Sequence, residues 1–384
     1  MNKAVKYRIY PTPEQEQKML ETFGCSRFVY NHYLALQKER YAQGQKHLSR
    51  TDCNNDCNRV LKKEYPWLKE VDKFALTNSI YALENGYRRF FQKNGGHPIF
   101  KSRHRSKNSY TTNFTNSNIK VWEDAVQLPK LGKIKAVIHR EIPSDWRIKQ
   151  ATVSQEKDGS CYVSLLCEYE RTAEPVNVCE EKVLGLDYKS DGLYMDSEGQ
   201  CAAMPHFYRI NQKKLAKAQR KLKKKMVRSK NYARQKKRIA RIHRKSANQR
   251  KDYLHKKSTE TANQYDLVCV ESLNMRRLAT WGFGNGKATM DNGYGMFLTM
   301  LEYKLADRGK YLVKVDPWFP STKTCCVCGR VKTMALSDRR YVCSCGNDMD
   351  RDHNAAVNIR NKGYEMYCRK AARERNKNCK AGTV

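Results

Sequence analysis

Two short apolar runs, each ending in an acidic residue, constrain the fold of this 384-residue chain more than any other feature. The first extends from Val183 to Asp187 and the second from Leu267 to Glu271. A long helical stretch separates them, and a leucine-rich helix precedes a third apolar run, Tyr311 to Val315. Short apolar runs that alternate with helices predict an α/β domain. In a parallel-type sheet, both acids would lie at the edge where functional residues gather.

A third acidic residue completes this pattern. Asp352 lies just ahead of the sequence Asn-Ala-Ala-Val-Asn-Ile, which predicts a compact helix start. Three acids brought together would repel one another, and two Mg²⁺ ions about 4 Å apart would relieve that repulsion, activate water and stabilise the leaving oxygen of a phosphodiester. Taken singly, an acid at a strand end is more often a surface residue or a helix cap. The sequence therefore predicts a magnesium site only from the three acids together.

Four cysteines form a metal-binding pattern near the end of the chain. They make Cys-x2-Cys, fourteen intervening residues and then Cys-x-Cys, with a glycine after each half: Cys325, Cys328, Cys343 and Cys345. Thiolates at these spacings can converge on one tetrahedral Zn²⁺, so the pattern predicts a zinc ribbon with one structural ion. Cys326 competes as a ligand, and coincidental clustering is the alternative interpretation.

Positive charge is concentrated in one segment. The chain has 75 Lys and Arg against 39 Asp and Glu, a formal net charge of +36, and 22 of the basic residues lie between Arg209 and Lys257, where Asp252 is the only acid. Like charges at helical spacing repel, so a helical hairpin there favours phosphates beside it over simple solvation. We expect nucleic-acid contacts from these residues: Lys213, Lys214, Arg220, Lys221, Lys224, Arg234, Arg238, Arg241 and Arg250. Tyr208, Tyr232, His243 and Tyr253 could stack on bases or pack between the two arms.

Other classes of protein fit the sequence poorly. No apolar run approaches the roughly 18 residues that a membrane span needs, and the first residues lack the apolar stretch of a signal peptide. The 15 cysteines are odd in number and scattered, which favours a reducing cytoplasm over a disulfide framework. We therefore expect a cytoplasmic protein whose partner is nucleic acid rather than a membrane.

The first half of the chain predicts helices followed by strands. Alternation from Val5 to Ile9 predicts a strand, and the Thr-x-x-Gln motif at Thr12 predicts a capped helix start. Apolar spacing predicts a further helix from about Asp72 to Gln92. The following residues, to about 170, are rich in Thr, Val, Ile and Tyr and predict a β-rich module. Arg171 to Lys182 has little periodicity and is typical of a linker.

Several motifs together resemble a known family. The segments Leu184–Tyr188 and Val270–Asn274, and the cysteine pattern running into Asp350–Ile359, resemble a RuvC-type nuclease domain with an inserted zinc ribbon. In this order the chain resembles TnpB, the transposon-encoded relatives of type V CRISPR nucleases. The resemblance extends to four other segments: Lys6–Thr12, Phe23–Asn31, Pro98–Ser102 and Asn248–His255.

The resemblance implies an RNA-guided DNA endonuclease. A guide RNA from the transposon end would pair with double-stranded target DNA beside a short adjacent motif, and a monomer with its RNA would cut in a prokaryotic cytoplasm, at the nucleoid. The resemblance assigns two catalytic Mg²⁺ to Asp187, Glu271 and Asp352, with Asp350 the weaker candidate for the third position, and one structural Zn²⁺ to the cysteines. A guide-RNA-dependent repressor that binds DNA without cutting is the alternative, and a transposase is a third hypothesis.

The implied fold is a multidomain α+β arrangement: a RuvC (RNase H-like) α/β nuclease domain with an inserted zinc ribbon, preceded by a β-barrel module that carries a helical insertion. The expected parts are residues 1–10 and 98–172 for the barrel, 11–97 for a helical recognition domain, 173–320 for the nuclease domain with its basic hairpin at 207–262, 321–347 for the ribbon, and 348–384 for the end of the nuclease domain and a basic tail. One departure from the family is Tyr188-Lys189-Ser190-Asp191, where leucine and glycine are common. Asp191 therefore has no assigned role.

Overall fold

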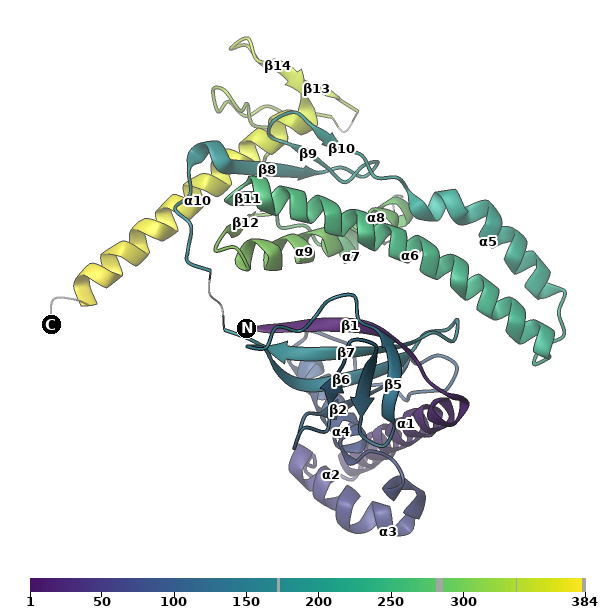
Figure 1. The fold of residues 1–384 in the computed structure, drawn as a ribbon. Helices are drawn as coiled ribbons and strands as arrows, with labels where there is room; N and C mark the ends of the chain where they lie inside the picture. The colour runs from purple at the N-terminus through teal and green to yellow at the C-terminus, as the bar shows by residue number, and fades with distance from the viewer. Residues whose placement is uncertain (171–172, 281–285, 336, 382–384) are drawn as a thin grey trace. The chain divides into compact units, whose positions relative to one another are not determined.

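The computed structural model describes residues 1–170, 173–280, 286–335 and 337–381 (Figure 1). The chain forms two compact units, Met1–Arg171 and Thr172–Val384. Several sequence predictions fall partly on other residues: the first two positions of the expected linker, residues 281–285 of the expected nuclease domain, residue 336 of the expected ribbon and the last three residues of the basic tail lie outside the described ranges. Within the described part of the chain, no helix is both long and apolar enough to span a bilayer.

A seven-stranded antiparallel sheet forms the centre of the first unit. Its order is β2-β6-β7-β1-β5-β4-β3. The strands are β1 (Asn2–Tyr10), β2 (Asn108–Asn113), β3 (Lys120–Val121), β4 (Ala125–Leu128), β5 (Gly132–Val137), β6 (Arg147–Gln155) and β7 (Cys161–Glu168). The predicted alternation in β1 is confirmed, because Val5, Tyr7 and Ile9 are buried. Strands β2 and β3 stand at the two ends of this order, and β3 has only two residues. The expected β-barrel module stays a prediction.

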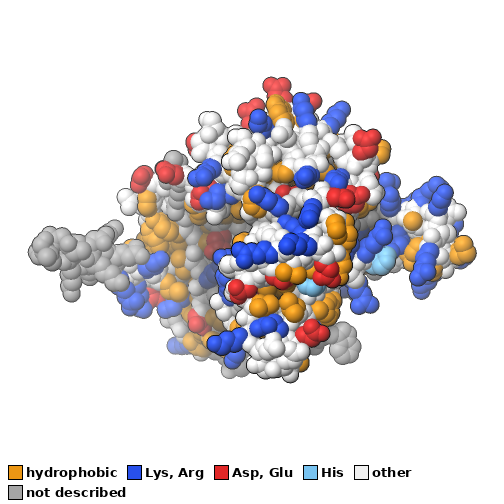
Figure 2. Space-filling model, turned by 90° about the horizontal axis from the view of Figure 1, so that it is seen from below, with side chains coloured by type: hydrophobic (Ala, Val, Ile, Leu, Met, Phe, Trp, Pro, Cys, Tyr) orange, Lys and Arg blue, Asp and Glu red, His pale blue; other side chains and the backbone are white. Residues whose placement is uncertain are grey.

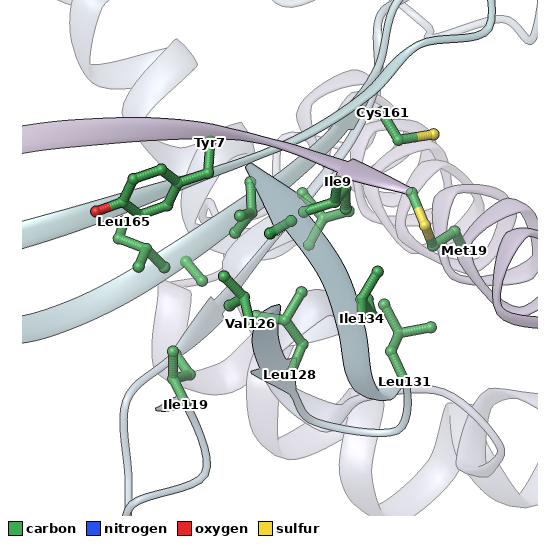
Figure 3. Close-up of a cluster of buried hydrophobic side chains, with 14 of the residues drawn as sticks. Tyr7, Ile9, Met19, Ile119, Val126, Leu128, Leu131, Ile134, Cys161 and Leu165 are labelled. Atoms are coloured by element: carbon green, nitrogen blue, oxygen red, sulfur yellow. The ribbon is translucent and has the colours of Figure 1, made fainter. Parts of the chain in front are cut away.

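Helices pack beside this sheet and complete the first unit. They are α1 (Pro13–Ala42), α2 (Arg50–Asp56), a π-helix (Cys57–Leu61), α3 (Lys62–Glu64), a 3₁₀ helix (Pro66–Lys69) and α4 (Lys73–Phe91). Helix α1 starts with the predicted capping box between Thr12 and Gln15, and Asp72 caps α4. Met19 of α1 joins Tyr7, Ile9 and Ile134 of the sheet in one apolar core (Figure 3).

A five-stranded sheet organises the second unit. Its order is β10-β9-β8-β11-β12, with β8 (Val183–Tyr188), β9 (Tyr194–Asp196), β10 (Cys201–Ala202), β11 (Leu267–Glu271) and β12 (Tyr311–Val315). Strands β8, β11 and β12 run parallel, as the three apolar runs predict, whereas β9 and β10 are antiparallel. The predicted α/β character of this half of the chain is therefore confirmed.

Helices cover both faces of the second sheet (Figure 1). The helices of the second unit are α5 (Phe207–Lys223), α6 (Lys230–Gln264), α7 (Met275–Leu278), α8 (Gly286–Asn292), α9 (Tyr294–Ala306) and α10 (Arg351–Ala381), and a 3₁₀ helix (Glu180–Lys182) precedes β8. Leu186 and Val270 share a core with residues of α6 and α9. Val183 and Cys269, on the other face, pack with Ile359 of α10. Because successive side chains of a strand point to opposite faces of the sheet, the helices on each face pack against a separate core.

Two glycines let α10 approach the sheet closely. A Cβ atom built on Gly185 of β8 would lie 2.1 Å from the carbonyl oxygen of Ala356, and one on Gly363 would lie 2.3 Å from Sγ of Cys269. Such distances exclude any side chain there, so backbone packs directly on backbone at Gly185. This contact sets where the first turn of α10 lies along β8, and that turn carries Asp352.

Candidate functional site

Strand register places two of the predicted acids side by side. Leu186 of β8 pairs with Val270 of the parallel strand β11. The next residue on each strand is acidic, Asp187 and Glu271, and neighbouring strands lie about 4.8 Å apart. Both acids therefore sit at the carboxyl edge of the sheet, where the sequence predicted them.

The third acid comes from the first turn of α10. Asp350 precedes the helix, and its Oδ1 accepts hydrogen bonds from the backbone N–H groups of Asp352 (2.8 Å) and His353 (3.1 Å). Asp350 is therefore engaged as a helix cap. The Asp352 carboxylate instead lies 3.6 Å from Nζ of Lys189 and 3.4 Å from the guanidinium of Arg351.

The electrostatics of the site couple these acids. Burial raises the pKa of Asp187 well above its ordinary value, the negative charges of Glu271 and Asp352 raise it further, and Arg351 and Lys189 oppose the shift. Burial also raises the pKa of Glu271, which a hydrogen bond from the Ser321 hydroxyl to Oε1 (2.9 Å) partly offsets. Uncompensated negative charge in a desolvated place fits a divalent cation, and carboxylate oxygens are the ligands that Mg²⁺ prefers.

Tyr294 is a site residue that the sequence reasoning missed. Its side chain is fully buried at the start of α9, and burial, followed by the charges of Asp187 and Glu271, raises its pKa well above the ordinary value. Its hydroxyl has no hydrogen-bond partner among the described residues. A tyrosine in an apolar helix pattern predicts only a core residue, so no sequence signal distinguished it.

Lys189 also lies at the site, from the segment that departs from the family pattern. Burial alone would lower the pKa of Lys189, but Cys201, Asp352 and Asp191 raise it overall. Asp191 is thus part of the charge environment of this lysine. Lys189, Arg351 and Arg339 are the cations of an open cleft of about 400 Å³, whose remaining lining residues are Tyr188, Ser190, Asp191, Asp350 and Asp352.

The four predicted zinc ligands converge. Their sulfur atoms all lie within 4.8 Å of one another, and two pairs, Cys325 with Cys345 and Cys328 with Cys343, are 3.6 Å apart. Tetrahedral Zn²⁺ with bonds of about 2.3 Å separates its sulfurs by about 3.8 Å, so the donor set and its spacing fit that ion. Cys326 lies apart from the cluster, with its thiol 3.5 Å from Sδ of Met349.

The module around these cysteines is small. It contains the hairpin of β13 (Arg340–Val342) and β14 (Asp348–Asp350) and leads directly into α10. Gly329 and Gly346, one after each cysteine pair, have positive φ angles of 73° and 92°. Among the described residues, only this cysteine group brings three or more potential metal ligands so close together. The carboxylates of Asp187, Glu271 and Asp352 are therefore spaced more widely than the ligands of one shared ion.

The basic segment forms a helical hairpin of α5 and α6. Eight of the nine predicted contact residues have exposed side chains, and none of the eight has an acidic partner among the residues that the structure describes: Lys213, Lys214, Arg220, Lys221, Lys224, Arg234, Arg238 and Arg241. Lys and Arg side chains gather on the projecting end of the hairpin (Figure 2). Arg250 differs, because its guanidinium donates to the buried carboxylate of Asp291 at 2.8 Å and is only 18% exposed.

The aromatic side chains of the hairpin also differ in how far they are exposed. His243 is exposed, whereas Tyr208 and Tyr232 are half-buried. Tyr253 donates its hydroxyl to the carbonyl of Ala203 and meets Phe207 edge to face. Tyr253 is therefore used in packing, which is the alternative left open for it by the sequence.

Three protein-family profiles match the chain. One described as "Probable transposase" matches residues 164–282, one described as "Cas12f1-like, TNB domain" matches 294–359, and one described as "Helix-turn-helix domain" matches 1–46. The third region contains β1 and the single helix α1. The second includes Asp352 and all four clustered cysteines.

Two relatives match almost the whole chain. The "Putative RNA-guided DNA endonuclease" of Streptomyces pristinaespiralis is 33% identical and the alignment covers 94% of this chain and 89% of the relative. The "Putative RNA-guided DNA endonuclease InsQ" of Escherichia coli (strain K12) is 30% identical, with 94% and 92% covered. A protein chain in the "Cryo-EM structure of the Cas12f1-sgRNA-target DNA complex" shares the fold, with a TM-score of 0.51 at 14% identity over 94% of this chain and 98% of that one.

Proposed function

The chain belongs to the TnpB family, and from this premise we propose that it is an RNA-guided DNA endonuclease of a transposable element. It would cleave double-stranded DNA next to a short transposon-adjacent motif by metal-dependent hydrolysis of a phosphodiester. The second unit, with its parallel strands and covering helices, has the mixed α/β fold of a RuvC-like nuclease. The juxtaposition of Asp187, Glu271 and Asp352 carries this proposal.

The three acids would hold two Mg²⁺ ions. Bound there, Mg²⁺ would supply activation of the attacking water and stabilisation of the leaving oxygen. Asp187 has the central place, because it is the most buried of the three and its pKa responds to both other acids. Lys189, Arg339 and Arg351 would orient the phosphate backbone of the cut strand, since their cationic side chains line the cleft beside Asp352.

The basic hairpin would hold nucleic acid by its phosphates. The eight exposed contact residues lack acidic partners in the described part of the chain, so neutralising phosphates would release counterions at little desolvation cost. Sequence recognition would come from pairing between guide RNA and target, with the protein reading backbone shape and the adjacent motif. The partners are thus a guide RNA made from the transposon end and its double-stranded target.

The expected division of the chain also belongs to this proposal. Residues 1–10, 11–97 and 98–172 would bind guide RNA and duplex, 173–320 and 348–384 would form the nuclease domain, and 321–347 would be its zinc ribbon. The protein would act as a monomer with one RNA in a prokaryotic cytoplasm. The convergence of the four cysteines within residues 321–347 supports the assignment of a zinc ribbon.

A cleavage assay with one guide and one matched duplex tests the proposal. Wild type should cut with Mg²⁺, whereas Asp187→Ala should bind the duplex equally well and cut at least 100-fold more slowly, because it loses a charge that holds metal. Asp350→Ala is the matched acidic control: it removes a helix cap and should retain substantial cleavage. Wild-type cutting by Asp187→Ala would refute the site. Specific binding without cutting by wild type, in Mg²⁺ or Mn²⁺, would favour the repressor.

A further inference from the structure

A buried chain of hydrogen bonds joins the cysteine module to the carboxylate site. Ser321, which precedes the first cysteine and is 3% exposed, donates its hydroxyl to Oε1 of Glu271 at 2.9 Å. Glu271 ends β11, where its side chain is only half-buried and would otherwise rotate between several rotamers. Among the described residues, only Ser321 donates a hydrogen bond to this carboxylate.

Ser321 is itself held from α10. Asn358 donates to the carbonyl oxygens of Ser321 (2.8 Å) and Thr324 (2.7 Å). Asn354, one helical turn earlier, donates to the same Thr324 oxygen at 2.7 Å. The two asparagines are four residues apart and therefore share one face of the helix, so both lie against the segment 321–324.

Asn354 also contacts the segment that carries the clustered cysteines. Oδ1 of Asn354 accepts from the backbone N–H of Cys326 at 3.0 Å and from the side-chain amide of Asn347 at 3.4 Å. Asn347 also lies 3.5 Å from Sγ of Cys325, a clustered thiol. Asn354 is fully buried and stands two residues after Asp352. The first turn of α10 thus carries both Asp352, an acid of the site, and Asn354, which binds the segment of the clustered cysteines.

We propose that the cysteine module positions the carboxylate site, with Ser321 as the positioning residue for Glu271 and with Asn354 and Asn358 as the supports that hold Ser321 in place. This inference rests on the proposed function, because it assumes that Glu271 helps to bind a divalent ion. Hydrogen-bond partners of a metal-binding carboxylate fix its orientation, and their loss typically weakens metal affinity by about 10- to 100-fold. The ordered module would therefore set the affinity of a site that none of its cysteines touches.

Mn²⁺ binding to the full-length RNA complex, followed by electron paramagnetic resonance, tests the inference without using cleavage. RNA also binds Mn²⁺, so the signal of interest is the portion that disappears in Asp187→Ala. Ser321→Ala should weaken this Asp187-dependent binding by about 10-fold, and Ser321→Thr should restore most of it because the hydroxyl returns. Asn358→Leu should weaken it in the same direction. Thr322→Val is the matched control and should bind as wild type does, because Thr322 is one residue away and its hydroxyl makes no hydrogen bond within the described part of the chain.

Zinc content and thermal stability of each variant separate positioning from loss of the fold. Ser321→Ala should keep its zinc and melt close to wild type, while it needs about 10-fold more Mn²⁺ for half-maximal cleavage. Wild-type Mn²⁺ affinity in Ser321→Ala and Asn358→Leu would overturn the inference and leave the proposed function standing. Absence of any Asp187-dependent Mn²⁺ in wild type would instead overturn the carboxylate site itself, and this inference with it.

Discussion

Among single residues, two buried carboxyl groups of the candidate site lower the stability of the metal-free protein. Asp187 and Glu271 lie where desolvation and mutual repulsion disfavour their charged forms. Structural carboxylates usually have the opposite shift, because they are paired with cations. The metal-free protein should therefore be stabilised by removing these charges, at the expense of activity.

Asp187→Asn tests this directly. In EDTA at neutral pH it should raise the free energy of unfolding by about 1–3 kcal/mol, because a buried charge disappears while the volume is kept. The stability gained by Asp187→Asn should grow as pH rises above about 4, because there the Asp187 carboxyl group ionises in the unfolded chain while burial opposes its ionisation in the folded protein. Thermal melting of the two proteins measures it, and Mg²⁺ should shrink the difference by stabilising wild type. Asp252→Asn, an exposed acid on α6, is the control; equal melting of Asp187→Asn and wild type would contradict the account.

Lys304 gives a second prediction at this scale. Its buried ammonium donates to the His255 carbonyl (2.6 Å) and to the hydroxyls of Ser258 (2.8 Å) and Thr259 (2.7 Å), and burial, followed by the charge of Arg308, lowers its pKa to about 8. An unfolded lysine has a pKa near 10.4. Between pH 8 and 10 the unfolded chain therefore binds more protons at this residue, so its contribution to stability rises with pH.

Urea unfolding of wild type and Lys304→Met at several pH values measures this contribution. The free energy of unfolding of wild type minus that of Lys304→Met should increase by about 1–2 kcal/mol from pH 7.5 to 9.5. Taking the difference removes the effect of other titrating groups, such as the buried thiols. Lys314→Met, an exposed lysine paired with Glu302, provides the control. Parallel curves for wild type and Lys304→Met would refute the assignment.

At the scale of elements, the approach of α10 to β8 links packing to the site. Gly185→Ala should cost about 2–4 kcal/mol of unfolding free energy, because its Cβ meets the Ala356 carbonyl and the helix must shift. Since α10 carries Asp352, cleavage should fall as well. Gly24→Ala on α1, which has open space around the added methyl group, should be neutral or slightly stabilising. Chemical denaturation and a cleavage assay check both variants; a silent Gly185→Ala would contradict the close packing.

The cysteine module makes a separate prediction. Elemental analysis should find one zinc ion per chain, and Cys328→Ser should lose it, because three remaining thiolates hold the ion poorly and zinc binding supplies folding free energy to so small a module. Cys326→Ser should keep the ion, since its thiol lies apart from the cluster. Zinc retained in Cys328→Ser would show that the ligand set is wrong.

For the molecule as a whole, a formal net charge of +36 disfavours the compact state through self-repulsion, so we expect a bound polyanion to stabilise the protein. Replacing Lys213, Lys214, Lys221 and Lys224 together by Gln should reduce the salt dependence of RNA binding, with the slope of log K against log salt flatter by about 3. Filter binding at several salt concentrations measures the slope. Lys149→Gln with Lys314→Gln, two lysines already paired with acids, should change it much less. An unchanged slope in the fourfold variant would place the phosphate contacts elsewhere.

The local elements and the chemistry they carry could be predicted from the amino-acid sequence. The short continuous apolar runs of β8 and β11 predict buried strands, Thr12 and Gln15 predict a cap, and the four-cysteine spacing predicts convergence, because each depends on residues near in sequence. The acids at the ends of β8 and β11 follow from the same local pattern.

Which of these residues come into contact depends on how the helices and sheets pack. The pairing of Arg250 with Asp291, the burial of Tyr294 beside Asp187 and the bond from Ser321 to Glu271 join residues at least 41 positions apart. No periodicity encodes such contacts, since they depend on how helices are placed on a sheet. The sheet order of the first unit has the same origin, because β1 pairs with β7 from the other end of that unit, whereas the sequence pattern indicates only a β-rich module there.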